Sequence, residues 1–294
     1  MSDEQINAPV GHEPPPRDES EVRARHESNR AGWNEGALHY ATENDATAAY
    51  LLAGNSNLHN VERRNLSTLG DLSTWCHTAI HLQCASGRDT LSLWNEGVRR
   101  VIGVDISDVH IENARKITAA LRAAGRDVAA DWYRCDVLDT PHELDGTADL
   151  VYTGRGAICW IMDLQAHARV VARLLKPGGV YHILDEHPVT YLFDLDTERF
   201  EYNGANYFSN YESSQGWPST YIGESLNIPV EKMAVKHEAA WNLMDIFNAL
   251  RGAGLVVDYL GEHPDEYWDI FPNLKPDLRG KLPLTFSIMA RKPA

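Results

Sequence analysis

The feature that most constrains the fold is the stretch from Ala79 to Asp105, which reads AIHLQCASGRDTLSLWNEGVRRVIGVD. It predicts a buried strand over residues 80–82, a turn of small residues over 84–87, a helix, and a second apolar strand that ends on the acid. Small residues at such a turn let the backbone approach a ligand closely, and an acid at the strand tip can accept both hydroxyls of a ribose. The stretch therefore predicts the first half of a nucleotide-binding βαβ unit. An ordinary βα connection is the alternative, because the turn keeps only one glycine, Gly87.

The rest of the chain continues the alternation of strands and helices. Ser107 caps the next expected helix, a further helix is expected over 164–175, and a third over 241–251 follows a long irregular segment. Such alternation predicts a parallel sheet with helices on both faces, in which ligands bind beyond the carboxyl ends of the strands. The expected strands are 80–83, 100–105, 128–135, 149–153, 180–185, 255–260 and 284–291.

The chain divides into three expected parts. Residues 1–20 are polar and contain the run GHEPPPRDES, which predicts a disordered tail. Residues 21–75 are helical in pattern and form an N-terminal cap, which is either a structural cover for the core or a lid over the ligand. Residues 76–294 make up the main domain, whose insertion 188–238 is long, irregular and rich in aromatic residues. The first interpretation of this insertion is a substrate lid, and the alternative is a docking surface for a partner or a second copy.

The charge balance limits the partners that this chain can bind. Its 42 acidic residues against 27 Lys and Arg give a formal net charge of −15. A chain this acidic, without a basic stripe, should repel a phosphate backbone, so we expect no nucleic acid partner but a small molecule, including a cationic one. No cysteine spacing indicates a metal site. The sequence shows no secretory signal and no apolar run that could cross a bilayer, so we expect no membrane partner and a cytoplasmic location, with the oligomeric state unknown.

Five motifs in order carry a resemblance to a known family. They are HLQCASGRDT (81–90), GVDIS (103–107), CDVLD (135–139), DLVYT (149–153) and LLKPGGVYHIL (174–184). Residues from about 80 to 291 resemble a class I S-adenosylmethionine-dependent methyltransferase. The resemblance implies an α/β fold with a doubly wound, mostly parallel seven-stranded sheet of the Rossmann-like methyltransferase kind. It also implies S-adenosyl-L-methionine as the cofactor. The tail and the aromatic insertion fall outside the resemblance.

The resemblance assigns the adenosine end of the cofactor site to residues that follow the second and third expected strands. Asp105 would bind the ribose hydroxyls, and Asp136 would meet the adenine amino group. Ile106 and Val137 would sandwich the adenine ring.

The methionine end of the cofactor would pack against Gly87 and the backbone of Cys84 to Ser86. Gln83 stands where the family usually has an acid, and Ala85 stands where it usually has glycine. Both departures are interpreted as tuning of the cofactor pocket. The implied cofactor-binding residues are together Gln83, Cys84, Ala85, Gly87, Asp105, Ile106, Asp136, Val137 and Thr153.

Methyl transfer is an in-line displacement on a sulfonium, and the leaving group is a neutral thioether. The protein therefore mainly aligns the nucleophile with the methyl carbon and the sulfur, and keeps water out. Aromatic faces attract a sulfonium through cation–π interaction. The residues expected to supply such faces and to contact the substrate are Trp33, Tyr40, Trp160 and Tyr191.

An oxygen or nitrogen nucleophile needs a base when it must lose a proton. His187 is the first candidate because the ordinary pKa of a histidine lies near neutrality, and the alternative is a histidine that only hydrogen-bonds the loop before Pro188. Glu186 could orient that histidine or hold a cationic substrate. Arg155 could clamp a substrate carboxylate, with a salt bridge on the rim as the alternative.

The leading hypothesis is a small-molecule O- or N-methyltransferase of secondary metabolism. The main alternative is an enzyme of the same fold that uses S-adenosylmethionine for another reaction, such as intramolecular attack of its own amino group with release of methylthioadenosine. The third hypothesis is a non-enzymatic binding module or a dinucleotide-linked dehydrogenase. The dehydrogenase is disfavoured because the turn lacks the repeated glycines that seat a pyrophosphate.

Overall fold

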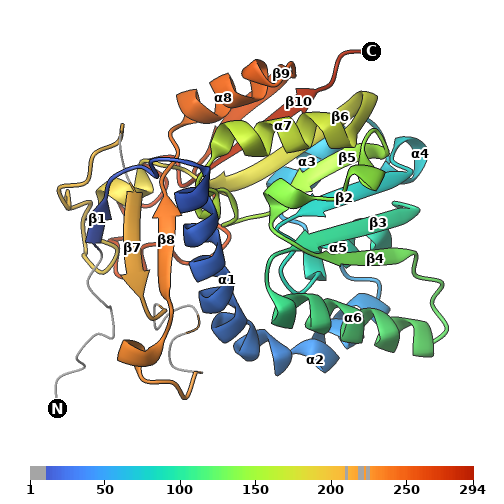
Figure 1. Ribbon diagram of the computed structural model, residues 1–294, viewed down its shortest axis with the longest axis horizontal. Helices are drawn as coiled ribbons and strands as arrows, with labels where there is room; N and C mark the ends of the chain where they lie inside the picture. The colour runs from blue at the N-terminus through green and yellow to red at the C-terminus, as the bar shows by residue number, and fades with distance from the viewer. Residues whose placement is uncertain (1–10, 209–210, 218–221, 223–225) are drawn as a thin grey trace.

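The computed structural model describes residues 11–208, 211–217, 222 and 226–294. Its main sheet has seven strands in the order β4-β3-β2-β5-β6-β10-β9 (Figure 1). The pairings from β4 to β6 are parallel, whereas β10 runs antiparallel to both of its neighbours. The predicted fold, a doubly wound and mostly parallel seven-stranded sheet, is confirmed. The strands are β2 (Thr78–Leu82), β3 (Arg100–Asp105), β4 (Ala130–Arg134), β5 (Ala148–Thr153), β6 (Leu175–Glu186), β9 (Val256–His263) and β10 (Thr285–Arg291).

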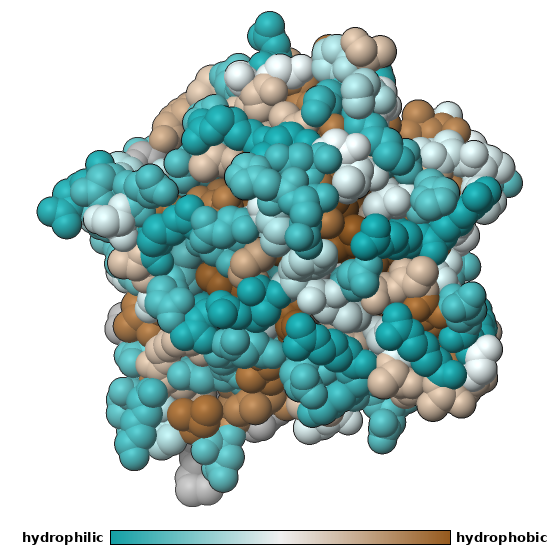
Figure 2. All heavy atoms as spheres, turned by 45° about the vertical axis from the view of Figure 1, so that its right-hand side comes forward, coloured by the Kyte–Doolittle hydropathy of each residue, from teal (hydrophilic) through white to brown (hydrophobic). Residues whose placement is uncertain are grey.

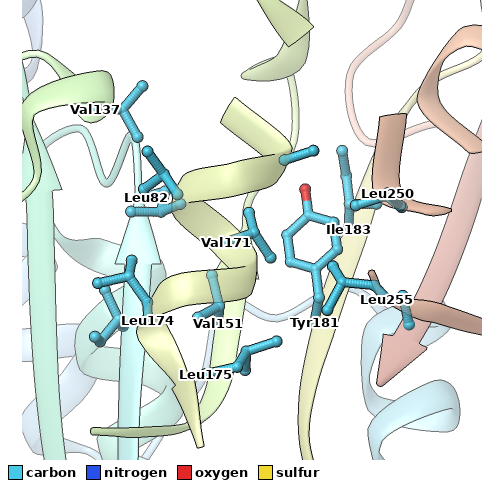
Figure 3. Packing of buried hydrophobic residues seen from close by; sticks show 14 of the residues in the cluster. Leu82, Val137, Val151, Val171, Leu174, Leu175, Tyr181, Ile183, Leu250 and Leu255 are labelled. Carbon is cyan, nitrogen blue, oxygen red and sulfur yellow. The ribbon is translucent and has the colours of Figure 1, made fainter. Parts of the chain in front are cut away.

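Helices cover both faces of the main sheet. Successive residues of each central strand point to opposite faces, and both sets of side chains are buried against helices. On one face, Ile80 and Leu82 of β2 share an apolar core with α7 and α8 (Figure 3). On the other face, Ala79 of the same strand packs with α5 and α6. Both faces of β2 are therefore buried, as a parallel sheet requires. The helices are α5 (Arg88–Asn95), α6 (Asp108–Ala123), α7 (Leu164–Leu174) and α8 (Leu243–Gly252).

Side-chain caps begin three of the helices around the sheet, α6, α7 and α8. The Ser107 hydroxyl accepts a hydrogen bond from the backbone N–H of His110 at 3.2 Å, so α6 begins where the sequence predicts. Asp163 and Asn242 cap α7 and α8 in the same way. The strand boundary that differs most from the prediction is the start of β6, which lies at Leu175 rather than at residue 180, because Leu175 already pairs with Ala148 of β5.

The N-terminal segment differs from the predicted disordered tail. β1 (Gly11–Glu13) pairs with β7 (Tyr211–Gln215), which pairs with β8 (Val235–Ala239), and the three strands form a second sheet. The Asp18 carboxylate caps α1 (Glu19–Ala41) by accepting from the backbone N–H of Glu21 at 3.0 Å. These contacts tie residues 11–13 to β7 and Asp18 to the start of α1, while residues 1–10 lie outside the described residues. The other N-terminal helices are α2 (Asn44–Leu52), α3 (Asn60–Ser67) and α4 (Leu72–Trp75).

Helix α1 lies between the second sheet and the main sheet (Figure 1). The Asn29 amide donates to the backbone carbonyl of His237 in β8 at 2.8 Å and accepts from its N–H at 2.7 Å. On the side of the main sheet, Arg30 pairs with Asp108 at the start of α6. The N-terminal cap and the aromatic insertion therefore form one connected layer, which faces the carboxyl edge of the main sheet.

The outer surface is mostly hydrophilic on the face drawn in Figure 2, where apolar side chains form only scattered patches. Such a surface agrees with the formal net charge of −15. Among the helices of the described residues, none combines the length and the apolarity that crossing a membrane requires.

Candidate active site

A cavity of about 1160 Å³ lies between the carboxyl edge of the main sheet and the layer that α1 and the second sheet form. The loops that follow β2, β3, β4 and β5 and the end of β6 line one side of it, and residues of α1, β7 and β8 line the other. Pockets for a single small molecule measure roughly 300–1,000 Å³. The cavity therefore has room for a nucleoside cofactor and a second small molecule.

Asp105 stands at the tip of β3 on the cavity wall. Its carboxylate accepts hydrogen bonds from the backbone N–H groups of Ala85 and Ser107, each at 2.8 Å, which hold it against the turn that follows β2. Burial raises the pKa of Asp105 to about 6, although these backbone hydrogen bonds act in the opposite direction. The neighbouring Ile106 also lines the cavity.

The turn after β2 has an unusual backbone. Gln83 has a φ of +59° and Ala85 has a φ of +45°, a left-handed region that favours glycine. The backbone at Gln83 thus has a conformation typical of glycine. The sequence comparison, which concerned only the exchange of an acid for Gln83, did not predict this conformation. The Gln83 side chain reaches across the cavity wall, where Nε2 donates to the Ala157 carbonyl at 2.7 Å. Its Oε1 is buried without a partner in the described part of the chain.

Two residues expected in the cofactor site do not lie on the cavity wall formed by the described residues. Gly87 has a φ of +78°, and a Cβ added there would lie 2.4 Å from the Trp132 ring, so glycine is needed for packing and for the backbone conformation. Thr153 is fully buried and accepts a hydrogen bond from the Tyr181 hydroxyl at 3.1 Å. Both residues therefore support the turn and the strand tip from behind.

Asp136 lines the cavity after β4, as does Val137, but helix α1 already engages its carboxylate. His26 Nδ1 lies 2.7 Å from Asp136 Oδ2, and an Arg23 guanidinium nitrogen lies 3.0 Å from the same oxygen. The other oxygen accepts from the backbone N–H of Leu138 at 2.9 Å. Asp136 therefore ties the N-terminal cap to the main sheet at the cavity wall.

An aromatic wall stands opposite the strand tips. The Trp33 ring lies 4.6 Å from that of Trp217 and 5.3 Å from that of Trp160, measured between centroids. Tyr40 and Tyr191 also line the cavity. All four residues expected to contact the substrate, Trp33, Tyr40, Trp160 and Tyr191, thus reach the cavity.

Arg155 lines the cavity after β5, but a carboxylate already binds its guanidinium. A terminal nitrogen of Arg155 lies 2.8 Å from both carboxylate oxygens of Asp89, and the Asn57 amide donates to one of the same oxygens at 2.5 Å. The structure therefore shows the predicted alternative, a salt bridge, rather than a guanidinium free to clamp a substrate carboxylate.

His187 and Glu186 face different surroundings. His187 Nε2 lies 2.9 Å from a carboxylate oxygen of Glu262, Nδ1 accepts from the backbone N–H of Val189 at 3.1 Å, and the ring is not part of the cavity wall among the described residues. Glu186 does line the cavity, and its carboxylate accepts from the Thr190 hydroxyl at 2.7 Å. Burial raises the pKa of Glu186 to about 7. His187, the first candidate for the base, therefore hydrogen-bonds the loop that begins at Pro188, whereas Glu186 lines the cavity.

The sequence profile described as "Methyltransferase domain" matches residues 79–179, which span β2 to the start of β6. Residues 79–179 therefore carry a methyltransferase domain, and the resemblance to class I S-adenosylmethionine-dependent methyltransferases is confirmed. The chain is an enzyme, and S-adenosylmethionine is its cofactor. A search of curated proteins returned no match.

Solved structures share the fold of this methyltransferase at low sequence identity. An S-adenosylmethionine-dependent methyltransferase from Mesorhizobium loti is 23% identical, with a TM-score of 0.51 over 78% of this chain and 96% of the other. A putative one from Listeria monocytogenes is 15% identical, with a TM-score of 0.56 over 79% of this chain and 98% of the other. Geranyl diphosphate C-methyltransferase from Streptomyces coelicolor A3(2) is 17% identical, with a TM-score of 0.51 over 80% of this chain and 77% of the other.

Several cavity residues of the methyltransferase were not singled out from its sequence, among them Lys236, Glu238 and His110. Lys236 and Glu238 come from β8, and His110 comes from the first turn of α6. The alternation of residues 235–239 is a strand signal that places Lys236 and Glu238 on one face, but the segment was assigned to an irregular insertion. His110 carries no such signal, because only the packing of α1 against α6 brings it to the cavity.

Proposed function

We propose that this methyltransferase transfers a methyl group to an oxygen or nitrogen atom of a small-molecule acceptor held in the cavity. The observation that carries the proposal is that one cavity is lined by two chemically different groups of residues, which we call its nucleoside end and its acceptor end. Asp105 and the turn after β2 form a nucleoside end, whereas Trp33, Trp160 and Glu186 form an aromatic and acidic end. A large cavity with a few convergent polar groups and raised carboxyl pKa values is typical of a small-molecule active site.

The residues of the nucleoside end fit the cofactor. The buried Oε1 of Gln83 lacks a partner among the described residues and is available to accept from the cofactor's amino group. Asp105 would accept the ribose hydroxyls, and Ile106 and Val137 would flank the adenine ring, with Asp136 near its amino group. Cys84 and Ala85 would lie along the methionine part. S-adenosylmethionine, when bound, supplies an electrophilic methyl carbon on a sulfonium.

The cap and the insertion contribute aromatic residues to the acceptor end, and they act together as the substrate lid. Trp33 comes from residues 21–75 and Trp217 from residues 188–238, and their rings lie in contact. These aromatic faces exclude water and favour the positive charge of the sulfonium. The substrate contacts of Trp33, Tyr40, Trp160 and Tyr191 follow from this arrangement.

Glu186 acts as the general base in this proposal. It is a carboxylate on the cavity wall with a pKa of about 7, so it can take a proton from an acceptor hydroxyl or ammonium near neutral pH. Thr190 fixes one of its oxygens. His187 has a structural role here, since it bonds Glu262 and the loop.

Product analysis tests the proposal. The protein is incubated with S-adenosylmethionine alone and then with a mixed panel of amines, alcohols and phenols. We expect S-adenosylhomocysteine to accumulate only when an acceptor is present. Methylthioadenosine that accumulates without an acceptor would support the cyclisation hypothesis and contradict methyl transfer.

A matched pair of variants tests the base. Glu186→Gln keeps the shape of the side chain and is expected to lower kcat by about 10²–10⁴-fold, the usual range for loss of a general base. The control is Glu231→Gln, because Glu231 is exposed and lies outside the cavity wall. Equal kcat values for the two variants would remove Glu186 from the mechanism.

A further inference from the structure

The acceptor end of the cavity carries two carboxylates that face the same space. Glu186 stands at the end of β6, and Glu238 stands on β8, which belongs to the other sheet. Burial raises the pKa of each to about 7, and the charge of Glu238 contributes to the rise at Glu186. Among the described residues, neither carboxylate forms a salt bridge with Lys, Arg or His. The Lys236 charge on the same strand lowers the pKa of Glu238, so one ammonium faces two carboxylates and the acceptor end keeps an excess of negative charge when both are ionised.

The aromatic wall beside these carboxylates already binds an ammonium group. The Lys236 ammonium nitrogen lies 4.5 Å from the centroid of the Trp217 ring and donates to the Gly216 carbonyl. Lys236 is 2% exposed, and burial lowers its pKa. A tryptophan face that stabilises a buried ammonium of the protein can also stabilise the ammonium of a ligand. The Trp33 and Trp160 rings, which contact each other, enlarge this aromatic surface.

His110 supplies an independent indication of a ligand at this wall. It is 1% exposed, lines the cavity and packs against Trp33 with 5.5 Å between ring centroids. Nδ1 lies 2.8 Å from the Ser86 hydroxyl, but Nε2 is buried without a partner in the described part of the chain. Burial lowers the pKa of His110 to about 3, so the ring is neutral. A neutral ring adds no positive charge and leaves one nitrogen for a ligand, between the cofactor turn and the aromatic wall.

We infer that the acceptor is an amine, which enters as its ammonium form and is held by Glu238 and Glu186 against the Trp33, Trp160 and Trp217 faces. This inference rests on the proposed function and narrows its acceptor class from oxygen or nitrogen to nitrogen. A phenol or alcohol acceptor brings no positive charge for the carboxylates, and a carboxylic acid acceptor is repelled by them.

The chemistry balances with these groups alone and the cofactor that the family uses. The ammonium R–NH3⁺ gives one proton to the Glu186 carboxylate and becomes R–NH2, while Glu238 keeps its charge beside the nitrogen. The nitrogen lone pair forms the N–C bond to the methyl carbon as the C–S bond breaks, and the electron pair of that bond goes to sulfur. The products are R–NH2⁺–CH3 and the neutral thioether S-adenosylhomocysteine. The positive charge thus moves from sulfur to the nitrogen, next to the Glu238 carboxylate.

A size-matched set of ligands tests the inference by calorimetry on protein saturated with S-adenosylhomocysteine. The set is phenethylamine, 2-phenylethanol and phenylacetate, all small relative to a cavity of about 1160 Å³. We expect the amine to bind about tenfold or more tightly than either of the others, the scale of a buried charge pair. Equal or tighter binding of the alcohol or of the acid would overturn the inference, as would a lack of binding by all three.

Variants connect the preference to the carboxylates. Glu238→Gln is expected to remove the preference for phenethylamine over 2-phenylethanol, whereas Glu231→Gln, at an exposed position outside the cavity wall, is expected to retain it. S-adenosylhomocysteine affinity within about twofold of wild type shows that each variant is folded. A preference that survives both Glu238→Gln and Glu186→Gln overturns the inference. If the wild type does not bind S-adenosylhomocysteine, the proposed cofactor roles are contradicted. If it binds S-adenosylhomocysteine but prefers 2-phenylethanol, only the inference of an amine acceptor is overturned, and the proposed methyl transfer stands.

Discussion

At the scale of single residues, Asp105 connects the turn after β2 to the cavity. Two backbone N–H groups hold its carboxylate in place, and ribose hydroxyls are the partners that this carboxylate would accept. Asp105→Ala is therefore expected to weaken S-adenosylhomocysteine binding by at least about tenfold, because hydrogen bonds to a charged group are worth about 1.5–3 kcal/mol each. Calorimetry measures the change.

The control for Asp105 is Asp131→Ala, which removes a carboxylate that pairs with Arg100 at the surface of β4. It should leave the affinity for S-adenosylhomocysteine unchanged. Similar affinities in the two variants would show that the ligand does not depend on Asp105.

Glu186 makes the stability of the ligand-free protein depend on pH. Its folded pKa of about 7 lies above the ordinary value of a glutamate, so the folded protein binds this proton more tightly than the unfolded chain does. The stability that this proton contributes is fully present below the unfolded pKa and is lost as pH rises through the folded pKa. Glu186→Gln removes this titration. The difference in Tm, variant minus wild type, should therefore increase as the pH rises from about 5 to about 8. Thermal unfolding followed by circular dichroism measures both curves, and parallel curves would contradict the prediction.

At the scale of elements, α1 is shaped to receive the aromatic wall. A Cβ added at Gly36 would lie 2.9 Å from the Trp217 ring, and one at Gly32 would lie 2.7 Å from Lys236. Glycine costs a helix interior roughly 0.5–1 kcal/mol relative to alanine. Glycine at these two positions lets Trp217 and Lys236 approach the helix closely, at the expense of this helix stability.

A pair of glycine substitutions tests this reading of α1. Gly36→Ala should lower Tm and shift the tryptophan fluorescence, because Trp217 has to move. Gly252→Ala in α8 should raise Tm, because the added Cβ meets only the Gln165 side chain at 3.5 Å. An increase in Tm for both variants would show that Trp217 does not depend on a glycine at this position.

At the scale of the whole molecule, the cap, the insertion and the main sheet meet at one cavity. Asp136 binds α1 from the main sheet, and Asn29 binds α1 to β8, so the layers are joined by polar contacts at the cavity wall. A ligand in the cavity contacts both layers and is absent from the unfolded chain, which makes it a stabiliser of the whole fold.

S-adenosylhomocysteine at about 100 times its Kd should therefore stabilise the wild type by about 2.7 kcal/mol. The matching rise in Tm, measured by differential scanning calorimetry, is expected to fall to about half or less in Asp105→Ala at the same concentration, because a tenfold weaker Kd leaves about 1.4 kcal/mol of stabilisation, and to remain in Asp131→Ala. A rise of equal size in both variants would place the ligand away from β3.

The main sheet was predictable because its signals are local. The run from Ala79 to Asp105 shows a strand, a turn and a strand within one stretch, and Ser107 caps its helix through a residue only three positions away. Apolar periodicity and caps depend on near neighbours in the chain, so they can be recognised without the tertiary structure. The four aromatic residues expected to contact the substrate, Trp33, Tyr40, Trp160 and Tyr191, all line the cavity, although only Tyr191 belongs to the insertion 188–238.

The role of each polar group in the cavity was decided by tertiary contacts. Arg155 is bound by Asp89, His187 is bound by Glu262, and Asp136 is bound by His26, and each of these partners is distant in the sequence or belongs to another element. Residues 11–13 are ordered for the same reason, because their partner strand β7 lies about two hundred residues further along. The sequence by itself determined the main sheet and the position of Asp105 at a strand tip, since those depend on local pattern. Only the tertiary structure decided which charges remain unpaired at the acceptor end, because pairing depends on what the fold brings within hydrogen-bond distance.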